Sequence, residues 1–126
     1  MVLSRRILLA DDDESVRFGI EELLLDLGLE VHTAETGPEA LEVARSVRIH
    51  AAVLDVHMPG CTGLDCLPIL LDQVVGLPCI LYSGNLTRAI ERTALSAGAF
   101  SVLAKPVQPE LFRTEVLRAL ATWPES

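Results

Sequence analysis

The chain has 126 residues, of which half are hydrophobic and 22% are charged. This length and composition fit a single packed domain, placed at residues 1–126, and exclude a disordered chain. The 18 acidic residues outnumber the 10 lysines and arginines, which gives a formal net charge of -8. Such an excess of acids argues against direct binding to nucleic acid or to an anionic membrane.

Targeting signals are not expected in this sequence. The apolar run at residues 7–10 ends at Asp11, so no signal-peptide core follows the basic start. No apolar run approaches the roughly 18 residues that a membrane span needs. We therefore expect a cytoplasmic protein.

Short apolar runs alternate with helical patterns along the whole chain. Strands are predicted at residues 6–10, 30–34, 51–54, 78–82 and 101–104, and helices at about 16–27, 36–47, 64–72, 86–97 and 109–121. Pro68 should kink the third helix or shift its start, and Ala97 is expected on the inner face of the fourth. Strict alternation predicts an α/β fold, with a doubly wound five-stranded parallel sheet and five flanking helices.

Polar residues follow several of these strands at their carboxyl ends, where ligands bind in such sheets. They are Asp11, Asp12 and Asp13 after the first strand, Asp55 after the third, Ser83 after the fourth, and Lys105, the only lysine, after the fifth. Clustered carboxylates repel each other, and Mg²⁺ would remove that conflict. One carboxylate could then attack phosphorus while the lysine and the metal hold the phosphoryl oxygens.

Four motifs resemble the receiver domain of two-component response regulators, in order and over essentially the whole chain. They are Ile7-Leu8-Leu9-Ala10-Asp11-Asp12-Asp13, Asp55-x-x-Met58-Pro59-Gly60-x-x-Gly63, Ser83-Gly84, and Ala97-Gly98-Ala99 leading to Lys105-Pro106. The resemblance implies a flavodoxin-like strand order of 2-1-3-4-5. It also implies a cis peptide bond between Lys105 and Pro106.

The resemblance implies a role for each residue of the site. Asp55 is the phosphoacceptor, and Lys105 pairs with the phosphoryl oxygens. Asp12 and Asp55 ligate Mg²⁺, with Asp11 helping through water and His57 supplying its backbone carbonyl. Ser83 contacts the phosphoryl group and reports its presence.

Three further positions concern switching and timing. The family usually carries an aromatic residue three positions before the lysine, and its ring moves inward on phosphorylation; here this position is Val102. We therefore expect a modified switch involving Ser83 and Val102. His57 and Asn85 occupy positions that tune dephosphorylation in the family, although both can equally be plain solvent-facing loop residues.

The leading interpretation is a signalling switch phosphorylated on Asp55 by a histidine kinase or a phosphotransfer protein. The surface formed by the last two helices and the fifth strand would then control partner binding, and the resemblance also allows a homodimer. No separate substrate is turned over, so the chain is not expected to be an enzyme beyond its own phosphorylation and dephosphorylation.

Two alternatives stay open. A receiver that works as a fixed interaction module, without phosphorylation, gains some support from Val102 but not from the complete set of site residues. A phosphatase of the haloacid dehalogenase type would use Asp11-x-Asp13 as its nucleophile motif. The acid pair expected after Lys105 is missing, since only Glu110 follows soon after it, and no cap domain fits this length.

Overall fold

A computed structural model describes residues 4–123; the expected outer limits of the domain, residues 1 and 126, lie outside the described residues. Five parallel strands form one sheet in the order β2-β1-β3-β4-β5, which confirms the predicted topology. The strands are β1 (Arg6–Ala10), β2 (Glu30–Ala34), β3 (Ala51–Asp55), β4 (Cys79–Ser83) and β5 (Ser101–Ala104). The helices are α1 (Glu14–Asp26), α2 (Gly37–Ser46), α3 (Gly63–Gln73), α4 (Arg88–Ser96) and α5 (Pro109–Leu120).

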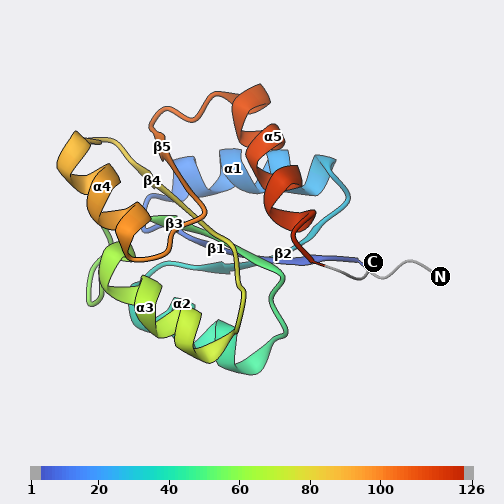
Figure 1. The fold of residues 1–126 in the computed structure, drawn as a ribbon. Coiled ribbons are helices and arrows are strands. Elements are labelled where there is room, and N and C mark those ends of the chain that lie inside the picture. Colours follow the sequence, from blue (N-terminus) through green and yellow to red (C-terminus); the bar gives the residue numbers. More distant parts are fainter. Residues whose placement is uncertain (1–3, 124–126) are drawn as a thin grey trace.

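Helices cover both faces of the sheet (Figure 1). Alternate residues of each strand enter different cores because successive side chains point to opposite faces. Ile7 and Leu9 pack with α1 and α5, whereas Leu8 and Ala10 pack with α2, α3 and α4. The central strands β3 and β4 are buried on both faces, as their continuous apolar sequences predict. Among residues 4–123, no helix combines the length and apolar character needed to cross a bilayer.

Local signals at the helix ends explain where the structure departs from the expected boundaries. The hydroxyl of Thr87 accepts the Ile90 N–H, so α4 begins at Arg88 rather than at residue 86. Ala97 follows α4 as an exposed cap, not on the inner face as expected. Thr62 caps α3 in the same way, and Pro68 neither ends this helix nor moves its start beyond Gly63.

The strand register places the ends of the central strands at one edge. Asp55 of β3 pairs with Tyr82 of β4, and Ser83 pairs with Ala104 at the end of β5. The backbone N–H of Lys105 then donates to the Ser83 carbonyl, which continues the ladder into the next loop. The peptide bond between Lys105 and Pro106 is cis. Side chains from strands far apart in the sequence therefore meet at the carboxyl edge.

Candidate functional site

Two buried carboxylates and one ammonium group form the centre of the carboxyl edge. Asp11 is 0% exposed and Asp55 is 2% exposed. The Nζ atom of Lys105 lies 3.2 Å from Oδ2 of Asp55 and 3.5 Å from Oδ2 of Asp11. The structure thus brings together the acids and the lysine that the sequence predicted for this edge.

Asp12 adds a third carboxylate on the solvent side. One oxygen from each of Asp11, Asp12 and Asp55 lies within 4.8 Å of the other two, and Asp12 is exposed. Oxygen ligands with surplus negative charge and an open side suit Mg²⁺, which binds through one or two carboxylates and keeps several waters. The residues present therefore fit a magnesium ion.

The charge of Asp55 is only partly compensated. Burial raises the pKa of Asp55 above its ordinary value of 3.8, and the neighbouring charge of Asp11 acts in the same direction. The backbone N–H of His57, 3.2 Å from Oδ1 of Asp55, and the Lys105 ammonium oppose this rise in pKa. The site therefore gains stability from any further positive charge that approaches Asp55.

Backbone contacts hold the acids in place. The Asp13 N–H donates to Oδ1 of Asp11 over 2.8 Å, while the Asp13 side chain caps α1. The buried Arg17 donates from Nη1 to the Asp11 carbonyl over 2.8 Å. At Gly63, an added Cβ would lie 2.5 Å from the Asp55 carbonyl oxygen. Only glycine lets α3 begin this close to the acid.

Tyr82 belongs to the site, although the sequence analysis did not place it there. Its side chain is fully buried in the core beneath α1 and α5, and its hydroxyl donates to Oδ2 of Asp11 over 2.5 Å. Lys105 Nζ lies 5.0 Å from the centre of the Tyr82 ring. Burial, followed by the contact with Asp11, raises the pKa of Tyr82 well above its ordinary value, so the phenol stays protonated.

A signal for Tyr82 exists in the sequence, but it is weak. Tyr82 is the only tyrosine of the chain and lies in an otherwise aliphatic strand. A buried tyrosine usually needs a partner for its hydroxyl. Periodicity alone does not identify that partner, because Asp11 and Tyr82 are 71 residues apart.

The residues expected to switch and tune lie around this centre. Ser83 is fully buried, and its Oγ accepts the backbone N–H of Asn85 over 3.1 Å. The side chains of His57 and Asn85 are exposed. Val102 is half-buried and packs against the core on the α2, α3 and α4 face. Val102 pairs with Leu81 of β4, two residues before Ser83, so Ser83 and Val102 lie on neighbouring strands.

The uncompensated charge predicts that Asp55→Asn stabilises the domain when divalent cations are chelated. A carboxyl group whose pKa is higher in the folded state than in the unfolded state makes stability fall as the pH rises through that range. The gain should therefore be small near pH 4 and largest at neutral pH. Urea unfolding at several pH values measures it, with Asp72→Asn, an exposed acid on α3, as the control. Equal stability of Asp55→Asn and wild type at pH 7 would contradict the prediction.

The comparisons with known proteins agree with this geometry. The chain is 38% identical over 104 residues to the protein-glutamate methylesterase/protein-glutamine glutaminase 2 of Rhodopseudomonas palustris. The match covers 80% of this chain but only 28% of that relative's length.

Solved structures show the same fold. A CheY-like response regulator receiver domain from Methanospirillum hungatei superposes with a TM-score of 0.90 at 26% identity, over 95% of this chain and 96% of that one. The beryllofluoride-activated NtrC4 receiver domain dimer gives a TM-score of 0.88 at 26% identity, over 93% and 97%. The sequence model of the response regulator receiver domain matches residues 7–117. The chain therefore belongs to the response regulator receiver domain family.

Proposed function

We propose that this chain is a signalling switch that accepts a phosphoryl group on Asp55, with Mg²⁺, from a histidine kinase or a phosphotransfer protein. The observation that supports this most directly is the buried Asp55 carboxylate, which faces the Lys105 ammonium at 3.2 Å inside a group of three acids. Membership of the receiver family supports the same function.

In the proposed reaction, a carboxylate oxygen of Asp55 attacks the phosphorus atom, and the leaving group departs with the electron pair of its bond to phosphorus. Asp11, Asp12, Asp55 and the backbone carbonyl of His57 would hold Mg²⁺, which would offset the negative charge of the phosphoryl oxygens. Lys105 would pair with another of these oxygens.

Ser83 would recognise the product. Its Oγ accepts the Asn85 N–H, which leaves its hydroxyl proton for a phosphoryl oxygen. The phosphoryl group stays on Asp55 until water removes it, so the chain turns over no separate substrate.

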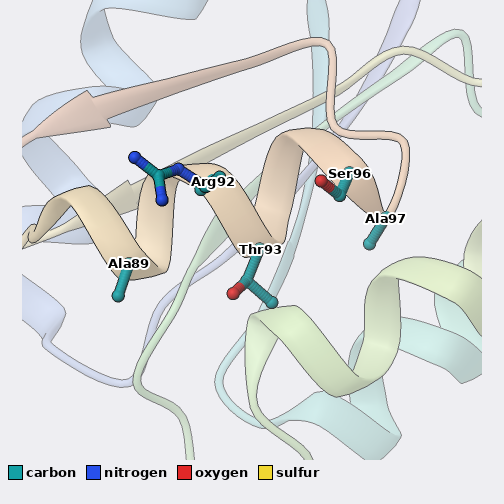
Figure 2. Close-up of a pocket in the computed structure, with 5 residues that line it drawn as sticks. All are labelled: Ala89, Arg92, Thr93, Ser96 and Ala97. Atoms are coloured by element: carbon teal, nitrogen blue, oxygen red, sulfur yellow. The ribbon is translucent and has the colours of Figure 1, made fainter.

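The surface formed by α4, β5 and α5 is proposed to change on phosphorylation and to control partner binding. Leu95, Leu111 and Leu117 are exposed on these two helices. A shallow depression of about 600 Å³ also lies along α4, lined by Ala89, Arg92, Thr93, Ser96 and Ala97 (Figure 2). None of these lining residues belongs to the acidic site. A change at Asp55 would therefore affect the binding of a partner, or of a second copy in a homodimer, through β4 and β5. Phosphorylation and partner binding are both proposed to take place in the cytoplasm.

Incubation with acetyl phosphate and Mg²⁺ should add one phosphoryl group to the chain. Intact-mass spectrometry measures the gain, with Asp55→Asn and a chelated sample as controls. Both controls should lose the gain completely, because one removes the acceptor and the other the cation. A gain that persists in Asp55→Asn would place the acceptor elsewhere. If wild type gains no mass and also fails to bind beryllofluoride, the chain works without phosphorylation.

His57→Ala and Asn85→Ala should change the lifetime of phosphorylated Asp55. Both side chains are exposed and their residues flank the acceptor and Ser83, so they can steer the attacking water. Decay of the phosphorylated mass after donor removal measures the half-life, and Gln73→Ala, an exposed change on α3, serves as the control. Half-lives equal to that of Gln73→Ala would leave both residues as plain loop positions.

Beryllofluoride should move Ser83, the loop at residues 84–87 and Val102 together. Val102 is smaller than the usual aromatic side chain, so the displacement is expected along β4 and β5 rather than as a ring rotation. Backbone amide shifts in the free and beryllofluoride-bound protein measure the change. If the amides of Ser83 and the following loop do not shift, no switch of this kind exists.

A further inference from the structure

Tyr82 contacts two members of the site at once, through different parts of its side chain. We propose that Tyr82 is a positioning residue of the phosphorylation site: its hydroxyl fixes the Asp11 carboxylate, and its ring supports the Lys105 ammonium. This inference rests on the proposed function, because it concerns how the same site is prepared for Mg²⁺ and the phosphoryl group.

The hydroxyl completes the set of donors around Asp11. Oδ1 of Asp11 accepts the Asp13 N–H over 2.8 Å, and Oδ2 accepts the Tyr82 hydroxyl over 2.5 Å. Bonds to both oxygens define the plane of the carboxylate. Asp11 is fully buried, so water does not easily replace a lost donor. Hydrogen bonds of this kind to groups around a metal orient them and raise metal affinity.

The same hydroxyl influences where Lys105 lies. The Tyr82 hydroxyl donates to Oδ2 of Asp11 over 2.5 Å. The Lys105 ammonium lies 3.5 Å from that same oxygen and 3.2 Å from Oδ2 of Asp55. A neutral donor on Asp11 thus leaves the only lysine nearer to Asp55, where the phosphoryl group would form.

The ring adds a second constraint on Lys105. Its centre lies 5.0 Å from Nζ, within the range in which an aromatic face attracts an ammonium group. Lysine has a flexible four-carbon stem, so two carboxylates alone leave several conformations open. Tyr82 forms one wall of the space that Nζ occupies.

A purely structural role for Tyr82 makes a different prediction. If the residue only fills the core beneath α1 and α5, phenylalanine should replace it with no effect on metal binding. Tyr82→Phe removes the hydroxyl and keeps the ring, whereas Tyr82→Leu removes both. Phe112→Leu is the matched control, because Phe112 is a fully buried aromatic residue of the same core.

Mg²⁺ titration by calorimetry, without any phosphoryl donor, is the first measurement. Tyr82→Phe should weaken Mg²⁺ affinity about tenfold, and Tyr82→Leu at least as much, while Phe112→Leu should bind like wild type. An affinity of Tyr82→Phe that is unchanged or tighter would overturn the role of the hydroxyl. If Tyr82→Leu does not fold, Tyr82→Phe alone decides this point.

A lysine label tests the ring separately. Lys105 is the only lysine, so protein grown with ¹³C-lysine gives one set of side-chain signals. The nearby ring should shift the ε-methylene signal away from its usual position in wild type and Tyr82→Phe. That shift should disappear in Tyr82→Leu and persist in Phe112→Leu. A wild-type signal at the position of a free lysine would overturn the role of the ring.

These outcomes separate the inference from the proposed function. If wild type binds Mg²⁺ but takes no phosphoryl group on Asp55, the function fails while the affinities still decide the role of Tyr82. If wild type is phosphorylated and Tyr82→Phe binds Mg²⁺ equally well, only the inference fails. If wild type does not bind Mg²⁺, the inference is wrong whatever the phosphorylation assay shows.

Discussion

Two buried carboxylates share one ammonium group at the carboxyl edge of the sheet, and this shortage of positive charge governs the rest of the site. Taking Asp11 and Asp55 out of water is costly, and Lys105 compensates only part of that cost. The raised pKa of Asp55 expresses the same imbalance. A core that served stability alone would replace these groups with apolar ones. Their presence at an open edge supports the proposal that the site takes up a cation and a phosphoryl group.

The sheet supplies the rigidity that such a site needs. Parallel strands deliver Asp11, Asp55 and Ser83 from separate parts of the chain to one edge, and strand pairing fixes their relative heights. Backbone contacts then restrict the positions of Asp11 and Asp55 further. Arg17 holds the Asp11 carbonyl, and Gly63 lets the start of α3 lie against the Asp55 carbonyl. The acids are therefore held from the backbone side as well as through their own oxygens.

The fold and the acidic centre could be predicted from the sequence because their signals are local and repeated. Buried parallel strands read as short apolar runs, and the residue after each run must lie at the carboxyl edge. Tyr82 could not be placed in this way. Side-chain alternation along β4 puts it on the face of α1 and α5, but does not show that the long phenol reaches past β3 to Asp11, the residue after β1. The position of Arg17 likewise depends on a tertiary contact with the Asp11 carbonyl rather than on the pattern of α1.

The alternation of side chains along β4 has a mechanical consequence. Tyr82 enters the layer beneath α1 and α5. By alternation Ser83, the next residue, points to the opposite face, which is the face where Leu81 packs with α2, α3 and α4. A rigid strand that shifts or tilts by a fraction of an ångström carries both side chains with it. The two helical layers are separated by the sheet, but the peptide unit between Tyr82 and Ser83 carries a side chain on each side of it. A displacement of β4 at this point would therefore move side chains in both layers at once.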